Sequence, residues 1–277
     1  MNKISIITVT FNSEQYIRET IKSVINQNYK NTEYIIIDGG STDRTLEIID
    51  EYKEFIHTLI SEPDDGMYFA LNKGFQLCSG DICGWINSDD ILMPQAFHSI
   101  NKAFLNNKAC QWLTGVPSNL ISDGSIISSE SHSFQDYSLK NYLLSKPYSI
   151  QQESTFFRRN LFIEVGGLNT EYTLAADYEL WLKFLKKSPL FLTNFYVGAF
   201  RSHDLQLSSN KVKYLEEVEI IRSKSETAFS CVTKISHGVH STLRKLFIKL
   251  YRRLFNGNTI LKYNKKNGSI DERTNWL

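Results

Sequence analysis

The sequence predicts an α/β protein with a Rossmann-like, mostly parallel sheet that is covered by helices on both faces. Short apolar runs alternate with segments whose apolar residues recur at helical spacing, as in a βαβ pattern. The predicted strands are residues 4–10, 34–37, 58–60 and 81–86, and the predicted helices between them are residues 17–25, 43–52 and 70–78. These strands are almost continuously apolar, which is typical of strands that are buried on both faces.

The second half of the sequence departs from this alternation. Residues 95–106 form a predicted helix, and Ser122-Asp123-Gly124 predicts a hairpin turn within residues 112–129. A helix over 175–187 and a strand over 190–200 follow. We therefore divide the chain into two halves of one domain, residues 1–106 and 107–210, and a C-terminal helical extension over residues 211–277.

Composition excludes several classes of protein. Lys and Arg total 31 against 30 Asp and Glu, so the net charge of +1 does not favour nucleic acid as a partner. The four cysteines have neither the spacing of a zinc site nor that of a disulfide framework, which favours reduced thiols in the cytoplasm. No run approaches the roughly 18 apolar residues of a membrane span, so we expect a chain that does not cross a bilayer.

Polar clusters follow the first two predicted strands. Residues 8–12 end the first strand and residues 38–43 end the second, at the sheet edge where open α/β sheets bind ligands. Asp38 can accept a hydrogen bond from a nucleotide base, and the glycines after it let the backbone approach a ligand closely. An ordinary turn with a helix cap explains the cluster equally well, and the dinucleotide and P-loop glycine patterns are both absent.

The fourth predicted strand runs directly into Asn87-Ser88-Asp89-Asp90. Unpaired buried carboxylates cost several kcal/mol each, so a cation is expected to compensate them. Oxygen ligands favour Mg²⁺ or Mn²⁺, which usually completes its shell with substrate phosphates and water. The sequence therefore predicts a metal and nucleotide site at this edge.

These motifs, together with Glu62-Pro63-Asp64-Asp65-Gly66, resemble those of family 2 glycosyltransferases, and the resemblance covers roughly residues 3–208. It implies the GT-A fold, a nucleotide-sugar donor, usually a UDP-sugar, in the first half and the acceptor in the second. It further implies a donor site that consists of Thr10, Phe11, Asn12, Asp38, Asp64, Asp65, Asn72, Lys73, Ser88 and Asp89. Asp38 would hold the base, Asp90 the metal, and His203 would approach the metal or the diphosphate.

Two of these assignments have a structural alternative. Asp65 precedes a predicted helix, so it can serve as a capping carboxylate instead. A lone histidine such as His203 is often a purely structural residue. Which of Asp89 and Asp90 binds the metal and which binds the donor also stays open.

The acceptor half contains Gln152-Glu153-Ser154-Thr155 and Ala176-Asp177-Tyr178-Glu179-Leu180-Trp181. The resemblance places Asp177 at the position of the catalytic base and implies that Gln152, Glu153 and Trp181 bind the acceptor. Helical geometry agrees, because Asp177 and Glu179 lie about 200° apart and Glu179 has Lys183 as an i+4 partner on the surface. A carboxylate that merely stabilises the helix N-terminus is the alternative for Asp177.

The expected reaction is inverting transfer of a hexose or N-acetylhexosamine to a sugar hydroxyl. By resemblance, the acceptor is a polyprenyl-diphosphate-linked glycan of bacterial surface polysaccharide synthesis, such as O-antigen, capsule or exopolysaccharide, at the cytoplasmic face of the membrane. Two other functions stay open: a nucleotidyltransferase, and a non-catalytic scaffold of polysaccharide assembly.

The tail carries an apolar stripe from Leu243 to Phe255 with basic residues around it and no acidic residue between positions 234 and 256. Such a basic amphipathic helix can lie in an anionic membrane surface and so hold the protein there peripherally. A helix packed against the catalytic domain is the alternative.

Overall fold

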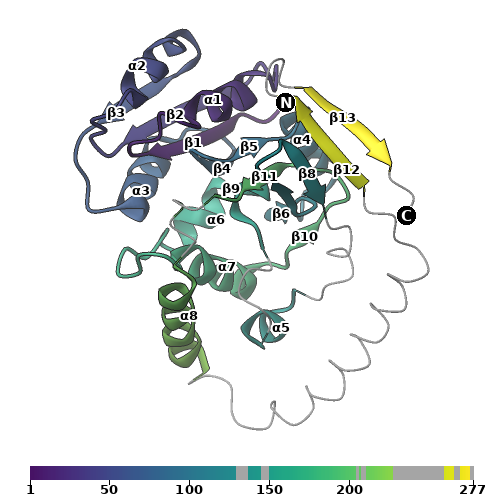
Figure 1. The fold of residues 1–277 in the computed structure, drawn as a ribbon. Helices are drawn as coiled ribbons and strands as arrows, with labels where there is room; N and C mark the ends of the chain where they lie inside the picture. The colour runs from purple at the N-terminus through teal and green to yellow at the C-terminus, as the bar shows by residue number, and fades with distance from the viewer. Residues whose placement is uncertain are drawn as a thin grey trace.

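A seven-stranded sheet forms the centre of the computed structural model, which describes residues 1–128, 137–144, 150–203, 206, 210–226, 259–264 and 269–274 (Figure 1). Its strand order is β10-β6-β9-β4-β1-β2-β3. The strands are β1 (Ile4–Thr10), β2 (Thr32–Asp38), β3 (Thr58–Ser61), β4 (Ile82–Asn87), β6 (Trp112–Thr114), β9 (Thr155–Arg158) and β10 (Phe191–Leu192). Strands β1 to β4 pair in parallel, whereas β9 runs antiparallel to both β4 and β6.

Helices cover both faces of this sheet, as the sequence predicts. One apolar cluster joins the sheet to α1 (Ile17–Ile25), α2 (Thr45–Asp50) and α4 (Ala96–Asn106). The other joins it to α3 (Met67–Leu77), α6 (Arg159–Glu164) and α7 (Ala176–Lys187). Strand β2 shows why its run is continuously apolar, because Tyr34 and Ile36 belong to the first cluster and Ile35 and Ile37 to the second.

A second, six-stranded sheet has the order β13-β12-β8-β7-β11-β5. Its strands are β5 (Ile91–Leu92), β7 (Ser118–Leu120), β8 (Ser125–Ser128), β11 (Gly198–Arg201), β12 (Thr259–Asn264) and β13 (Ser269–Thr274). The hairpin around Ser122-Asp123-Gly124 is confirmed, because β7 and β8 pair antiparallel. The pairing of β12 with β8 attaches the end of the chain to the domain.

The single strand predicted over 190–200 is wrong. The segment instead forms β10 in the central sheet and β11 in the second sheet. A Cβ at Gly198 would lie 2.3 Å from the carbonyl oxygen of Glu153, so β11 approaches that backbone more closely than any side chain permits. This close packing brings the strand alongside the 3₁₀ turn η3 (Gln152–Ser154), a contact that strand periodicity does not reveal.

The C-terminal extension begins with the predicted helical structure, α8 (Lys211–Glu226), whereas the pair β12 and β13 was not predicted. The chain also forms two short helical segments, α5 (Leu139–Leu144) and η1 (Lys53–Phe55). The predicted basic helix around residues 241–257 lies outside the described residues. Within the described part of the chain, no helix is long and apolar enough to span a membrane.

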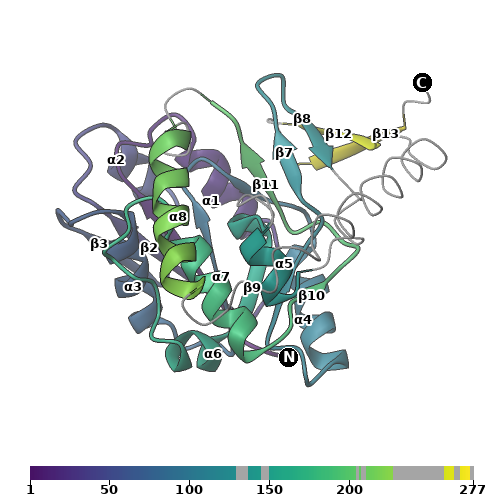
Figure 2. The same ribbon diagram turned by 90° about the horizontal axis from the view of Figure 1, so that it is seen from below.

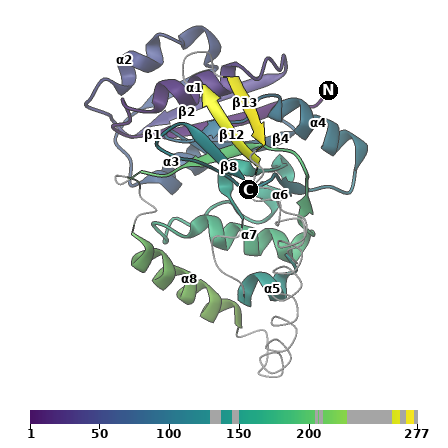
Figure 3. The ribbon, with the colours of Figure 1, turned by 45° about the vertical axis from the view of Figure 1, so that its right-hand side comes forward.

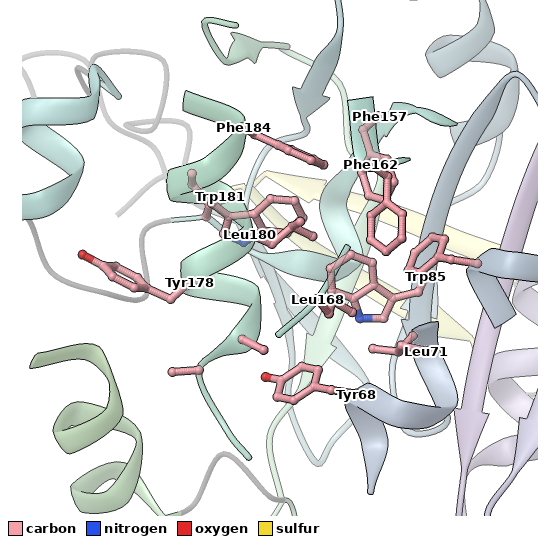
Figure 4. Close-up of a cluster of buried hydrophobic side chains, with 14 of the residues drawn as sticks. Tyr68, Leu71, Trp85, Phe157, Phe162, Leu168, Tyr178, Leu180, Trp181 and Phe184 are labelled. Atoms are coloured by element: carbon pink, nitrogen blue, oxygen red, sulfur yellow. The ribbon is translucent and has the colours of Figure 1, made fainter. Parts of the chain in front are cut away.

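Trp181 on α7 lies in the core, which corrects the prediction that it binds the acceptor. It is fully buried in the same cluster as Trp85 (Figure 4). Its ring stacks against Trp85 at 5.5 Å and against Trp112 at 5.6 Å between centroids. A side chain that is fully enclosed by other aromatic rings cannot contact an acceptor sugar. The stack fixes α7 against the sheet one helical turn after Asp177.

Candidate active site

The three polar motifs meet at one edge of the sheet. In the parallel register Thr10 lies beside Asp38, and Val9 lies beside Asn87, so β1, β2 and β4 end together. Asn12 joins the first two loops: its backbone N–H donates to Ser41 Oγ at 2.8 Å, and its Oδ1 accepts from the N–H of Thr42 at 2.9 Å. Asn12 adopts a left-handed φ of 47°, which asparagine tolerates better than most residues.

Asp38 organises the second loop. Its fully buried carboxylate accepts hydrogen bonds from the N–H groups of Gly40 and Ser41 at 3.1 and 3.0 Å and from Ser61 Oγ at 2.7 Å, as well as from the Ser41 hydroxyl. The residue therefore shapes the turn that the glycines form. Its direct contact with a base stays a prediction.

Phe11, Gly39 and Asp64 are neighbours beside that loop. The Phe11 side chain is 62% exposed, although it follows a fully buried strand. A Cβ at Gly39 would lie 3.3 Å from Asp64 Oδ2 and 3.5 Å from Phe11 Cδ2, so the glycine lets the ring and the carboxylate approach each other closely. An exposed ring beside a hydrogen-bond acceptor suits a flat heterocycle that carries N–H donors.

The Asn72 and Lys73 side chains of the helix that follows have partners within the protein. The Asn72 amide is occupied by Leu168, because its Nδ2 donates to the Leu168 carbonyl at 2.8 Å and its Oδ1 accepts the Leu168 N–H at 3.1 Å. The side chain thereby ties α3 to the turn after α6, and its assignment to the donor site stays a prediction. Lys73 forms an ion pair with Glu62, and Asp65 is exposed.

Three carboxylates gather at the end of β4. Asp90 is fully buried, with Oδ1 accepting from the N–H of Arg201 at 2.8 Å and Oδ2 from Gln152 Nε2 at 3.3 Å. Burial, together with the negative charges of Asp89 and Glu153, raises the pKa of Asp90 well above its usual range. Burial likewise raises the pKa of Glu153 to about 8, and Asp89 and Asp177 add to the shift. Negative charge in this cluster is thus unstable without a neutralising partner.

His203 approaches this cluster through Asp89. Its Nε2 lies 3.0 Å from Asp89 Oδ2, and its ring packs 4.8 Å from that of Tyr16. The sequence pairs His203 with Asp90 at the metal, but the structure brings it to Asp89, because both Asp90 oxygens are engaged by Arg201 and Gln152.

The donor atoms at this edge fit a hard divalent cation. Across the described residues, no three His, Cys, Asp or Glu side chains converge as a complete metal site. One carboxylate and one imidazole nevertheless match a Mg²⁺ or Mn²⁺ that takes its remaining ligands from phosphates and water. Glu153 Oε1 is buried and has no hydrogen-bond partner in the described part of the chain. This free acceptor is further evidence that the edge can bind a positively charged group.

Arg201 holds the cluster together, a role that the sequence analysis did not assign. Its Nε donates to the Asp89 carbonyl at 2.6 Å, and its Nη2 forms an ion pair with Glu19 at 2.8 Å. The guanidinium also lies 4.7 Å over the Tyr16 ring. The only signal in the sequence is that Arg201 stands two residues before His203.

Asp177 lies in the first turn of α7, and its Oδ1 is buried without a hydrogen-bond partner among the described residues. Burial raises its pKa to about 6, although the N–H groups of Tyr178 and Asp177 itself and the Tyr68 hydroxyl partly offset the shift. Such a carboxylate is ionised near neutral pH and is still basic enough to accept a proton. Glu179 pairs with Lys183 at 2.8 Å as predicted, but its side chain is largely buried and not solvated.

Comparison with known proteins assigns this arrangement to a family. The family model described as "Glycosyl transferase family 2" matches residues 5–166, which is more than half of the chain. The chain belongs to this glycosyltransferase family. Its relatives include the putative teichuronic acid biosynthesis glycosyltransferase TuaG of Bacillus subtilis, which is 29% identical over 76% of this chain and 83% of its own length.

Solved structures of glycosyltransferases share the fold. Residues 1–349 of Staphylococcus aureus TarS in complex with UDP-GlcNAc superpose with a TM-score of 0.62 and 15% identity, covering 99% of this chain and 97% of that one. The Pyrobaculum calidifontis mannosyltransferase PcManGT, in complex with GDP-Man and Mn²⁺, also gives a TM-score of 0.62, with 16% identity over 83% of this chain and 65% of that one. The GT-A fold expected from the motifs is confirmed.

The family 2 match ends before α7 begins. Asp177, Arg201 and His203 therefore lie beyond the matched segment, and their place in the site is known from the structure alone. Arg201 and His203 lie against the end of β4, and Asp177 lies close enough to Glu153 to influence the pKa of Glu153.

Proposed function

We propose that this glycosyltransferase is inverting and metal-dependent, and that it transfers a hexose or N-acetylhexosamine from a UDP-sugar to a sugar hydroxyl. The observation that carries the proposal is the half-buried Asp177, whose Oδ1 is buried and whose charge acts on Glu153 at the carboxylate edge. This edge can take a cation and a nucleotide diphosphate. A proton acceptor and a site for the leaving group are thus close together. Transfer by single displacement needs both.

The donor end follows from the group of Phe11, Gly39 and Asp64, which we call the donor slot. The ring of Phe11 would stack on the base, while Ser88 and Asp89 would contact the ribose and the phosphates. The solved relatives support a nucleotide sugar, because TarS binds UDP-GlcNAc and PcManGT binds GDP-Man.

Asp89 and His203 would hold the cation, which is Mn²⁺ or Mg²⁺. When bound, the ion stabilises negative charge on the departing diphosphate. We now prefer Asp89 to Asp90 as the ligand, because Asp90 is fully buried and both of its oxygens are bonded within the protein. Asp90 instead fixes Arg201, and through it the Asp89 backbone.

Asp177 acts on the acceptor. Its carboxylate accepts the proton of the acceptor hydroxyl as that oxygen attacks the anomeric carbon. The bond between this carbon and the phosphate oxygen breaks on the opposite side, so an α-linked donor gives a β-linked product. Gln152 and Glu153 line the approach between Asp177 and the cation edge.

The acceptor that we propose is a polyprenyl-diphosphate-linked glycan in bacterial surface polysaccharide synthesis. The relation to a putative teichuronic acid glycosyltransferase supports a cell-envelope polysaccharide as the product. The basic segment 243–255 would hold the enzyme at the cytoplasmic face of the membrane, where such a lipid lies.

Replacing the base is the direct test of this mechanism. We expect Asp177→Asn to lower the transfer rate by about 10²- to 10⁴-fold, because the amide cannot accept the proton. UDP affinity, measured by calorimetry, should stay within about twofold, since Asp177 is not part of the donor slot. Glu179→Gln on the same helix is the control, and unimpaired transfer by Asp177→Asn would eliminate Asp177 as the base.

Metal binding can be measured separately from activity. Titration of Mn²⁺ in the presence of UDP, followed by electron paramagnetic resonance, should give at least about tenfold weaker binding for Asp89→Asn and for His203→Ala. Asp50→Asn, an exposed carboxylate on α2, should bind Mn²⁺ like the wild type. Equal Mn²⁺ affinity in all four proteins would refute this ligand pair.

The membrane proposal is best tested with substitutions in the full chain, because β12 pairs with β8 and truncation would remove that strand. Lys249, Arg252 and Arg253 replaced together by Gln should weaken binding to phosphatidylserine vesicles, by about 1 kcal/mol for each charge. Replacing the exposed Lys30, Arg44 and Lys53 by Gln removes the same charge elsewhere. If both triple variants sediment with vesicles as the wild type does, the tail is not the anchor.

A further inference from the structure

Helix α8 packs beside α7 (Figures 2 and 3). A carboxylate lies in the middle of the buried face of α8. Tyr214, Val218 and Ile221 recur at helical spacing along this face and are all buried. Glu217 belongs to the same stripe and is only 9% exposed. A carboxylate in such a position needs several hydrogen-bond donors to offset its loss of hydration.

Glu217 obtains these donors from the segment that enters α7. Its Oε1 accepts from the N–H and the Oγ1 of Thr173 at 3.0 and 2.7 Å. Its Oε2 accepts from the N–H groups of Leu174 and Ala175 at 2.9 and 2.8 Å. Burial alone would raise the pKa of Glu217, but these four hydrogen bonds lower it below its usual value. The side chain is therefore ionised and fully bonded.

The entry to α7 needs this partner because it lacks a local cap. Ala175 occupies the N-cap position and has no side-chain acceptor. The next amides, those of Asp177 and Tyr178, interact with the Asp177 carboxylate itself. Glu217 from α8 thus binds the amides just before the helix, and the proposed base binds two amides of its first turn.

A second contact holds the same segment from the opposite side. The Tyr68 hydroxyl on α3 donates to the Leu174 carbonyl at 2.7 Å and also interacts with Asp177. Figure 4 shows the Tyr68 hydroxyl pointing toward the first turn of α7. Leu174 is therefore fixed through both its N–H and its carbonyl, three residues before the base.

We propose that Glu217 is a positioning residue for sugar transfer: it caps α7 from outside the family-matched segment and so holds the Asp177 carboxylate in its reactive orientation. This inference rests on the proposed role of Asp177. It makes α8 part of the catalytic apparatus, although α8 begins 45 residues after the family match ends.

The charge of Glu217 also acts on Asp177. The titratable groups that face Asp177 are Tyr68 on α3, Tyr142 on α5, Glu153 in η3 and Glu217 on α8. The negative charge of Glu217 raises the pKa of Asp177. Its removal therefore lowers that pKa, and the acidic limb of the activity profile should move to lower pH.

The test compares Glu217→Gln with Glu216→Gln, an exposed neighbour on the same helix that removes the same charge. In Glu217→Gln one oxygen becomes an NH₂ that faces N–H donors, so hydrogen exchange of amides 173–175 should accelerate by at least about tenfold. Transfer should lose about tenfold in kcat with donor KM unchanged, because the base is displaced and the donor slot is not. The acidic limb should shift to lower pH only in Glu217→Gln.

Glu217→Asp provides a second variant that keeps the charge but shortens the side chain. This variant should have a lower kcat than the wild type and protect amides 173–175 less well from hydrogen exchange. The acidic limb of its pH–activity profile should stay at the wild-type position. If Glu217→Gln does not fold, Glu217→Asp still decides the question by the same exchange measurement. Exchange and kcat equal to those of Glu216→Gln would overturn the proposal. A wild-type protein that transfers no sugar would refute the proposed function, whereas exchange would still report whether Glu217 caps α7.

Discussion

The backbone N–H of Arg201 that donates to Asp90 is the contact on which the site depends. It joins β11 of the second sheet to the end of β4 in the central sheet, across 111 residues of sequence. Through its side chain the same residue reaches the Asp89 carbonyl and Glu19. A fully buried aspartate is thereby satisfied within the protein, and the side chain of its neighbour Asp89 lies beside His203.

Helix α7 is fixed independently at two points. The stack of Trp181 between Trp85 and Trp112 anchors it to the sheet, and Glu217 from α8 holds the amides of Leu174 and Ala175 just before the helix. Asp177 lies between these anchors. Its Oδ1 is therefore kept buried at a defined place, and burial is what moves the pKa of Asp177 into the range that a general base requires.

The parallel sheet and the edge that carries the site could be predicted from the sequence, because continuous apolar runs that end in polar residues reflect burial and strand direction directly. Other features depend on contacts between distant residues. The roles of Asn72, Trp181 and Asp90 are set by Leu168, by two other tryptophans and by Arg201, and no local pattern identifies these partners. The division of residues 190–200 between two sheets likewise follows from packing of Gly198 on Glu153.

The central claim is that a buried carboxylate on α7 accepts the acceptor proton, and the pH dependence of single-turnover transfer tests it most directly. With the donor complex preformed, the rate constant should fall about tenfold per pH unit below the pKa of Asp177, which is about 6. Above that pKa it should reach a plateau. A rate constant that stays level down to about pH 4.5, in the range of an ordinary carboxylate, would contradict the account.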